Sequence, residues 1–462
     1  MSQHTSILFY AVILMVSSCQ QSAGDKQAAA GNDAPVKLIT LDPGHFHAAL
    51  VQKTGYPGID TTVHVYAPDG PEVAAYLNLV NQYNSRPENP THWNEVVYKG
   101  SDFAEKMLAE KKGNVVVLSG NNRLKTDYIS RSVKAGLNVL ADKPMAIDKA
   151  NFLKLVSTFD EAAAQKVLLY DIMTERSEIT NILQKELMHM PALFGEFKDG
   201  TEKEPAVMIE SIHYFSKQVS GKQLIRPDWF FDPTQQGDAI ADVGTHLVDL
   251  VQWQCFPGTV LDYSKDITIN SARIWPTPFT PSQFEAVTGK TGYPDFLKPY
   301  VKDSILNTHA NGEMNYTIKG KHVKIIARWD YKAEEGGDSH HAIVKGSKAV
   351  LEIRQTKKEN FKPVLYILPV DKKNPRVFDE AVQEAITKIV TTYPGVTVEK
   401  SGAEWKVVVP AKYDVGHEAH FGQVMERYLQ YLKEGKLPDW EVPNMIAKYY
   451  TTTTALETAS KK

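Results

Sequence analysis

Short runs of apolar residues alternate with helical periods in the first part of the chain, from Val36 to about Tyr170. Six runs have the length and the β-branched content of buried strands: VKLITL, TTVHVYAP, NEVVYK, NVVVLSG, LNVLADKP and KVLLYD. Segments such as SDFAEKMLAEKK and KTDYISRSVKAG, which lie between these runs, have the spacing of amphipathic helices. This alternation predicts an α/β domain in which a doubly wound parallel sheet carries helices on both faces.

The pattern changes after Tyr170. One helical segment, TNILQKELMHM, leads into runs rich in β-branched and aromatic residues, among them TINSARIW, GEMNYTIKG, HVKIIARWDY, AIVKGSKAVLEI and VLYILPV. Few helical segments separate these runs, which predicts an α+β domain with a large, mostly antiparallel sheet. We therefore divide the folded part into a Rossmann-type domain, residues 36–175, and an α+β domain, residues 176–462. The exposed face of the second sheet is where we expect a homo-oligomer to form.

The N-terminus has the pattern of an export signal. Ile7–Val16 is a ten-residue apolar run, too short to span a bilayer and of the right length for a signal peptide. Small residues precede Cys19, as in the lipobox of bacterial lipoproteins, in which the cysteine is lipidated. We expect residues 1–18 to be a signal peptide and 19–35 a lipidated tether, which makes the protein an exported, membrane-anchored lipoprotein facing the periplasm. The alternative is a frayed apolar N-terminus of a cytosolic protein.

Composition narrows the range of partners. The chain has 462 residues, a formal net charge of −3 and the residue usage of a soluble globular protein, so nothing indicates nucleic acid as a partner. Apart from Cys19 the only cysteine is Cys255, which excludes an internal disulfide once Cys19 is lipidated. The membrane is expected to be contacted through the lipid anchor alone.

The first strand ends in a turn that poses two alternatives. The sequence Asp42-Pro43-Gly44-His45-Phe46-His47 stands between the strand and a helical segment, where a dinucleotide pyrophosphate can bind backbone N–H groups. Aligned with G-x-G-x-x-G, it keeps only Gly44, the glycine that allows close approach of the phosphate. A histidine pair at a strand end is also typical of metal sites.

Two further segments carry candidate chemistry. Lys143, in Asp142-Lys143-Pro144, follows a short strand and is expected to project from the carboxyl edge of the sheet, where open α/β sheets bind ligands. In GDAIADVGTHLVDLVQW, a helix would place Asp242, His246 and Asp249 on one face. A carboxylate and an imidazole one turn apart can form an acid/base pair.

Taken in order, these segments resemble the glucose-fructose oxidoreductase and inositol dehydrogenase family, written Gfo/Idh/MocA, from Val36 to about Ala459. In that family a dinucleotide fold is followed by a strand-end Glu-Lys-Pro, here with Asp142 in place of Glu, and by a helix with Asp-x-Gly-x-His-x-x-Asp. The resemblance implies NAD as cofactor, with NADP possible. Its contacts would come from Gly44, His45, Phe46, His47, Asp69, Ser119, Asn121, Asn122, Asp142 and Lys143.

The chemistry that the resemblance implies is hydride transfer between nicotinamide and a carbinol carbon of a sugar, glycoside or polyol. His246 would be the general base and Asp242 would orient it, while Lys143 would bridge the substrate hydroxyl and the cofactor ribose. Side chains expected to contact the substrate are His213, Tyr214, Trp229 and Asp249.

Three other functions remain open. Some relatives use bound NAD transiently and act as glycosidases by oxidation, elimination and reduction, which suits an exported protein without free NAD. A metal-dependent hydrolase would use His45 and His47, completed by His340-His341 or by His417 and His420. A non-catalytic sugar-binding protein is the third alternative.

Overall fold

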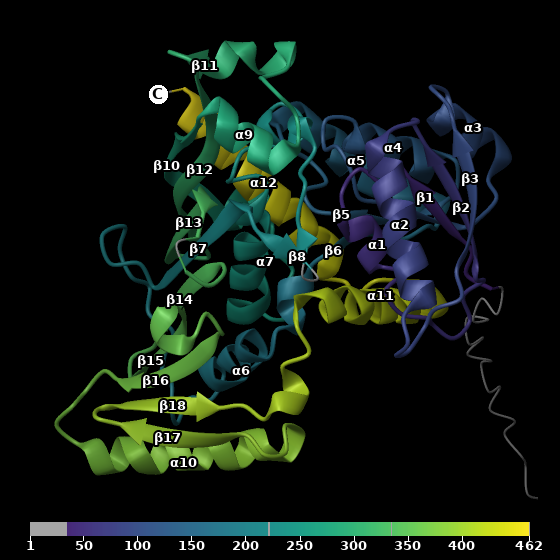
Figure 1. Cartoon of the computed structure of the whole chain (residues 1–462). Helices are drawn as coiled ribbons and strands as arrows, with labels where there is room; N and C mark the ends of the chain where they lie inside the picture. The colour runs from purple at the N-terminus through teal and green to yellow at the C-terminus, as the bar shows by residue number, and fades with distance from the viewer. Residues whose placement is uncertain (1–34, 220–221, 334, 462) are drawn as a thin grey trace, which may run out of the picture.

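The structure, a computed structural model, describes residues 35–461 except 220, 221 and 334 (Figure 1). The predicted signal peptide, Cys19 and all of the predicted tether except Pro35 lie outside the described residues. Among the helices of the described part, none combines the length and the hydropathy needed to cross a bilayer.

The first domain is built on a six-stranded parallel sheet in the order β3-β2-β1-β4-β5-β6. All six predicted strands are present, and the doubly wound sheet is confirmed. Residues of β1 and β4 are buried throughout, as expected when helices cover both faces. The strands are β1 (Leu38–Leu41), β2 (Thr62–Ala67), β3 (Asn94–Lys99), β4 (Val115–Leu118), β5 (Asn138–Asp142) and β6 (Leu169–Ile172). The helices are α1 (His47–Leu50), α2 (Pro71–Ser85), α3 (Phe103–Glu110), α4 (Lys125–Lys134) and α5 (Lys149–Gln165).

The second domain is built on a ten-stranded sheet, which is antiparallel except where β7 pairs with β13. This confirms the predicted α+β domain. Its strands are β7 (Val207–Ser216), β10 (Ile267–Phe279), β11 (Val301–Lys302), β12 (Ile305–Ile318), β13 (Lys321–Lys332), β14 (Ser339–Lys345), β15 (Ala349–Gln355), β16 (Val364–Pro369), β17 (Thr397–Ser401) and β18 (Glu404–Val408). A two-stranded ribbon, β8 (Gln218–Val219) and β9 (Lys222–Gln223), lies apart from the large sheet.

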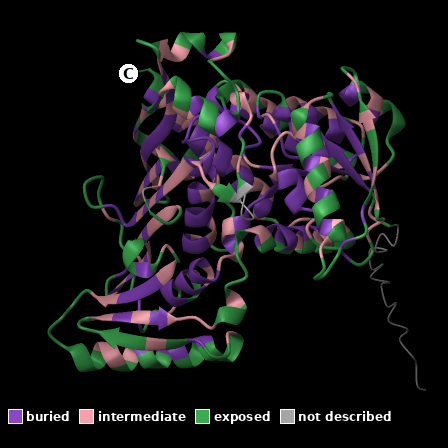
Figure 2. Ribbon diagram, viewed as in Figure 1, coloured by how far each residue is buried: buried purple, intermediate pink, exposed green. Residues whose placement is uncertain are grey.

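Helices α6 (Ile179–Met188) and α7 (Val243–Cys255) pack against this sheet, and Figure 2 shows that α7 is buried along most of its length. The remaining helices of the domain are α8 (Tyr263–Asp266), α9 (Pro281–Thr288) and α10 (Pro375–Thr392). Short 3-10 helices are η1 (Thr174–Ser177), η2 (Asp228–Phe231), η3 (Asp295–Tyr300), η4 (Lys357–Glu359) and η5 (Ala411–Tyr413).

The last two helices, α11 (His417–Glu434) and α12 (Glu441–Ser460), return to the first domain. Phe421 and Tyr428 of α11 and Tyr449 of α12 belong to the core of the parallel sheet. Two alanines of α12, Ala447 and Ala455, belong to the core of the second domain. The division at residue 175 therefore follows the order of the chain, whereas in space the two cores share the C-terminal helices.

A buried ionic network joins the elements where the two domains meet. Arg176 of η1 forms hydrogen bonds of 2.7 Å to each carboxylate oxygen of Asp249 on α7, and of 2.8 Å and 3.1 Å to Glu441 of α12. Lys448 of α12 lies 2.8 Å from Asp249 and 2.7 Å from Asp171 of β6. All five side chains are almost fully shielded from solvent, so the network fixes η1, α7 and α12 against the parallel sheet.

Candidate active site

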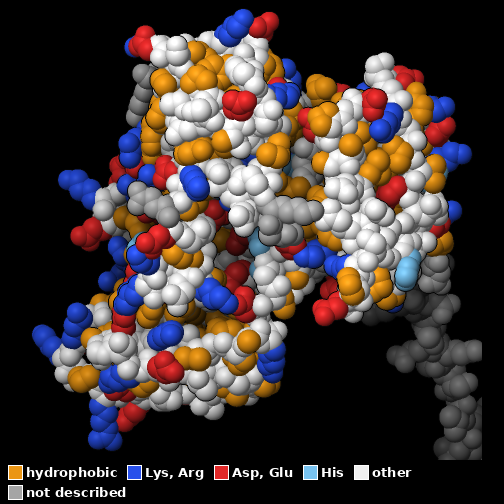
Figure 3. Space-filling view, in the orientation of Figure 1, with side chains coloured by type: hydrophobic (Ala, Val, Ile, Leu, Met, Phe, Trp, Pro, Cys, Tyr) orange, Lys and Arg blue, Asp and Glu red, His pale blue; other side chains and the backbone are white. Residues whose placement is uncertain are grey.

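A cavity of about 870 Å³ lies at the carboxyl edge of the parallel sheet. The cavity is lined by the segments that follow β1, β4, β5 and β6, by β7, by the start of α7 and by the start of α11, whose His417 lies 3.8 Å from Glu175. Figure 3 shows acidic side chains around a hollow near the centre of the molecule. The sequence places ligand-binding groups at this edge, because parallel strands all end there.

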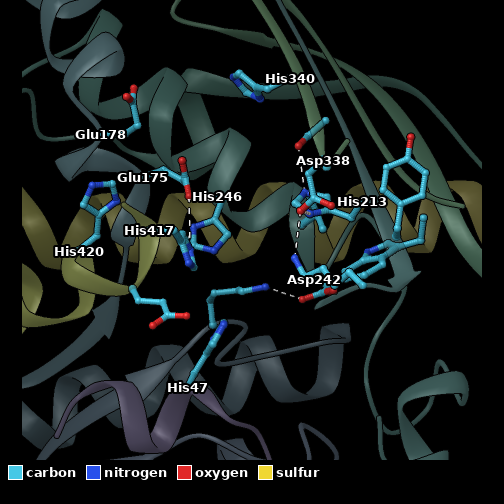
Figure 4. A pocket seen from close by; sticks show the side chains of 18 of the residues that line it. His47, Glu175, Glu178, His213, Asp242, His246, Asp338, His340, His417 and His420 are labelled. Atoms are coloured by element: carbon cyan, nitrogen blue, oxygen red, sulfur yellow. Dashed lines mark hydrogen bonds and ion pairs between the residues drawn. The ribbon is translucent and has the colours of Figure 1, made fainter. Parts of the chain in front are cut away.

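An ion pair between Lys143 and Asp242 lies in this cavity (Figure 4). Lys143 follows β5, Asp242 stands at the N-cap of α7, and the Lys143 Nζ is 2.6 Å from the Asp242 Oδ1. Both side chains are about nine-tenths buried, at 11% and 7% exposure, so the attraction is little screened by water. The carboxylate therefore holds the ammonium group of Lys143 in place inside the cavity.

His246 lies on α7 and lines the same cavity. Its Nδ1 is buried without a hydrogen-bond partner among the described residues. Burial, followed by the nearby Lys143 charge, lowers the pKa of His246 well below its usual range. The imidazole is therefore neutral, so one of its ring nitrogens keeps a lone pair that can accept a hydrogen bond.

The predicted Asp242–His246 pair is wrong. Asp242 stands at the N-cap of α7, and among the described residues no hydrogen bond joins its carboxylate to His246, whose Nδ1 has no partner. Its carboxylate is bound to the ammonium of Lys143 instead. Lys143, Asp242 and His246 line one cavity, as predicted, but the prediction paired the Asp242 carboxylate with the wrong residue.

Backbone hydrogen bonds already occupy two amides of the turn after β1. Gly44 N–H donates to the carbonyl of Asp42 at 2.8 Å, and His45 N–H donates to the carbonyl of Ser119 at 3.1 Å. The expected helix is only the four residues of α1, so its dipole contributes little here. His45, Phe46 and His47 still line the cavity, so at this turn imidazoles rather than the amides of Gly44 and His45 face a ligand.

Asp142 is buried beneath the turn. Its Oδ2 lies 2.9 Å from the Nδ1 of His47 and accepts from the Ser119 hydroxyl at 3.0 Å. Burial alone would raise its pKa, but His47 and Lys125 hold the pKa of this carboxyl well below its usual range. Burial lowers the pKa of both His45 and His47, whose neutral rings keep a nitrogen lone pair. Asp142 thus orients His47, and through Ser119 it is also tied to the segment that follows β4.

The other predicted cofactor residues have mixed positions. Asn122 lines the cavity, and its Oδ1 is buried without a partner among the described residues, while its Nδ2 donates to the carbonyl of Gln236. Asn121 is bound to Gln235 and does not line the cavity. Asp69 does not line it either, because its side chain is 79% exposed and pairs with Lys99.

Two of the four predicted substrate residues line the cavity. His213 and Tyr214 of β7 do so, and the Nδ1 of His213 lies 3.0 Å from Asp338. Trp229 of η2 is 8% exposed and packs in the core, with its ring over Gly44, so it offers no stacking surface to a sugar. Asp249 belongs to the buried ionic network and cannot contact a substrate. Both predictions fail because an amphipathic pattern does not separate a cavity wall from a core.

Glu175 lines the cavity, although the sequence pattern did not identify it. It follows β6 in η1 and lines the cavity, with its Oε1 3.8 Å from the Nε2 of His417 (Figure 4). Burial and the neighbouring Glu178 raise the pKa of Glu175 to about 7. Its position shortly after the sixth strand could have indicated it, because the carboxyl ends of all parallel strands lie at the same edge of the sheet. His417 comes from a helix distant in sequence, and its pattern with His420 indicated a metal ligand and not a neighbour of Glu175.

At one cavity the structure combines a parallel dinucleotide-type sheet, a strand-end Lys-Pro and an Asp-x-Gly-x-His motif that begins at the N-cap of α7. This combination defines a two-domain oxidoreductase. Residues 183–460 match the family model described as "Putative oxidoreductase C terminal domain". The chain belongs to this family, and its fold is that of the Gfo/Idh/MocA-type oxidoreductases.

Solved structures support this assignment. A "putative oxidoreductase" from Parabacteroides merdae is 52% identical, with a TM-score of 0.91 over 93% of this chain and 99% of that one. Levoglucosan dehydrogenase, solved with NADH and levoglucosan, is 11% identical, with a TM-score of 0.58 over 92% of this chain and 98% of that one. KijD10, a 3-ketoreductase from Actinomadura kijaniata solved with NADP, is 12% identical, with a TM-score of 0.55 over the same shares. The last two likenesses show the fold alone. No curated protein matches the chain significantly.

Proposed function

We propose that the protein is an NAD(P)-dependent oxidoreductase that transfers a hydride between nicotinamide and a carbinol carbon of a sugar, glycoside or polyol. The observation that supports this most directly is the Lys143–Asp242 ion pair beside the neutral imidazole of His246, in one cavity at the carboxyl edge of the parallel sheet. The ligands named for levoglucosan dehydrogenase, NADH and levoglucosan, agree with this cofactor and this substrate class, and the NADP named for KijD10 agrees with the cofactor.

The residues present fit the nicotinamide end of a dinucleotide. The buried, unpartnered Oδ1 of Asn122 is an acceptor for which a carboxamide N–H is a suitable donor. Lys143 and His246 line the same cavity and would bind a ribose or substrate hydroxyl. At the pyrophosphate end the fit departs from the usual pattern, because the Gly44 and His45 amides are already bonded and His45, Phe46 and His47 line the wall.

A nicotinamide bound there would accept or supply the hydride. The chain's own residues manage the substrate oxygen. The Lys143 ammonium, held in place by Asp242, donates a hydrogen bond to that oxygen and stabilises negative charge on it. The neutral His246 accepts the hydroxyl proton during oxidation and returns it during reduction.

The second candidate is a glycosidase that uses NAD transiently, and one observation favours it. A glycoside must receive a proton at its leaving oxygen, and Glu175, with its pKa raised to about 7, is a second proton donor in the cavity. The two functions differ in product: a dehydrogenase releases an oxidised sugar, whereas the glycosidase releases free sugar and aglycone.

We also propose that the protein is an exported lipoprotein held at the membrane by Cys19, and that the large sheet forms the contact between copies. The N-terminal pattern supports the first proposal, and the exposed face of an antiparallel sheet supports the second.

The experiment that tests the function combines nucleotide analysis with turnover. Purified protein is denatured, the released nucleotide is identified by mass spectrometry, and intact protein is incubated with sugars and glycosides while both oxidised sugar and free sugar are measured. Lys143→Met and His246→Ala should each reduce turnover by about 10²–10⁴-fold, because each removes one group that acts on the substrate oxygen.

Folding of these variants is checked by far-UV circular dichroism. Lys332→Met, which removes another lysine of the cavity lining, is the matched control and should keep turnover within a few-fold. Protein that neither carries nor binds NAD(H) or NADP(H) would contradict the proposal.

A further inference from the structure

The turn after β1 brings two histidines against one carboxylate. His45 and His47 stand at the second variable position and at the last glycine position of the fingerprint, and Asp142 ends β5, the second strand along from β1 in the sheet. The Asp142 Oδ2 lies 2.9 Å from the Nδ1 of His47 and 3.7 Å from the Nδ1 of His45. One ligand atom from each of the three residues lies within 4.8 Å of the other two.

These separations are those of a metal site. Ligand atoms around a tetrahedral zinc ion, with bonds of about 2.0–2.1 Å, are roughly 3.4 Å apart. The Asp142–His47 and Asp142–His45 distances lie on either side of that value. The Nδ1 of His45 is buried and has no hydrogen-bond partner among the described residues, although a carboxylate oxygen stands just beyond hydrogen-bonding reach. A shared ion would satisfy that nitrogen.

The carboxylate is also oriented as a metal ligand usually is. Ser119 donates its hydroxyl to the Asp142 Oδ2 at 3.0 Å, and the backbone N–H of Lys143 donates to the Asp142 Oδ1 at 3.0 Å. Such outer hydrogen bonds fix ligand geometry in metalloproteins. Of the two lysines close by, Lys143 is neutralised by Asp242, and Lys125 donates to the backbone carbonyl of Asp142 rather than to its carboxylate.

We propose that His45, His47 and Asp142 bind one divalent transition-metal ion, which leaves its remaining coordination positions open to the cavity. Two imidazoles and one carboxylate suit zinc, iron, cobalt or manganese rather than magnesium or calcium. The open positions take oxygen ligands, such as a sugar hydroxyl or carbonyl. His417 and His420, once candidates to complete such a site, line the cavity but lie outside this group, and the third ligand is Asp142.

The proposal is independent of hydride transfer, so its test uses metal binding and not turnover. Purified full-length protein is stripped with a chelator and titrated with Zn²⁺, Mn²⁺, Co²⁺ or Fe²⁺ alone by calorimetry, the last without oxygen. We expect one ion per chain for at least one metal. His45→Ala, His47→Ala and Asp142→Asn should each weaken its binding more than about 100-fold, since losing an outer-shell partner alone costs about 10–100-fold.

His420→Ala is the matched control, because it removes a cavity-lining histidine outside the group. It should bind the ion with unchanged affinity. Anomalous scattering from a crystal of the unmodified protein soaked with the bound metal locates the ion even if a ligand variant fails to fold. No binding of any of the four ions, unchanged binding in the ligand variants, or an ion found elsewhere would overturn the proposal. Nucleotide content measured on the same sample reports separately on the oxidoreductase function.

Discussion

Lys448→Met should destabilise the protein far more than Asp249→Asn, although the two side chains touch. The network contains three carboxylates, Asp171, Asp249 and Glu441, and two cations, Arg176 and Lys448. Removing Asp249 leaves each cation with one carboxylate: Arg176 keeps Glu441, and Lys448 keeps Asp171. Removing Lys448 leaves three buried carboxylates with a single cation.

The magnitudes follow from burial. Lys448 is 0% exposed and both its partners are 1% exposed, so its loss leaves charge that water cannot reach. Breaking such a pair costs about 3–5 kcal/mol of unfolding free energy, and we expect about 4 kcal/mol for Lys448→Met. Asp249→Asn replaces one acceptor oxygen with an amide N–H₂ that cannot accept from Arg176 or Lys448, but each cation keeps another carboxylate, so the change should cost about 2 kcal/mol. Lys388→Met, at an exposed pair on α10, is the control and should cost less than about 0.5 kcal/mol.

Acid should reverse part of the Lys448→Met penalty. In the native protein, burial alone would raise the pKa of Asp249, but Arg176 and Lys448 hold this pKa far below its usual range. The stability that the ionised Asp249 contributes is therefore present above about pH 4 and is lost as pH falls. In the variant an orphaned carboxylate acquires a raised folded-state pKa. Its protonated form is favoured, so the deficit is largest at neutral pH and shrinks toward about pH 5.

The assay is urea unfolding followed by tryptophan fluorescence at both pH values, with the unfolding free energy taken by linear extrapolation. Equal losses for Lys448→Met and Asp249→Asn, or a deficit for Lys448→Met that does not change with pH, would refute the charge-balance argument.

Three further predictions concern the cavity and the N-terminus. Because burial raises the pKa of Glu175 to about 7, turnover that needs its proton should decline above that pH, and Glu175→Gln should have lower activity without that decline in its pH profile. Gly44→Val should reduce co-purified nucleotide at least about tenfold, because a Cβ there already meets the Gly120 Cα at 3.4 Å and the Trp229 ring at 3.5 Å, whereas Gly55→Val, in open space, should retain it. Cys19→Ser should release the protein from washed membranes into the soluble fraction, and a variant that still sediments with membranes would contradict lipid anchoring.

Much of the fold could be predicted because it depends on local patterns. Strands buried on both faces read as continuous apolar runs, and all six of the parallel sheet were recognised. The start of α7 was not recognised from the sequence. A helix can contain an aspartate such as Asp242, and only its position at the N-cap in the structure shows that the helix begins after it. At this capping position the Asp242 carboxylate pairs with Lys143 and not with His246.

The candidate site could be predicted only in part, for a different reason. Lys143 and His246 belong to motifs that can be recognised in the sequence, and both line the cavity. Glu175 and His417 are brought there by the packing of η1 and α11, and such long-range contacts leave no periodic trace. Asp249 shows the reverse: its spacing fits a catalytic face, yet Arg176 and α12 bury it completely.

The return of α11 and α12 determines the order in which the protein can fold. Phe421, Tyr428 and Tyr449 complete the core of a sheet whose strands end at Ile172, so a ribosome must make almost the whole chain before that core can close. Until then the growing N-terminal half exposes apolar surface, and its final packing depends on contacts hundreds of residues apart in sequence. Folding of the first half is therefore coupled to synthesis of the last helix, and a chain cut before α11 lacks part of both cores.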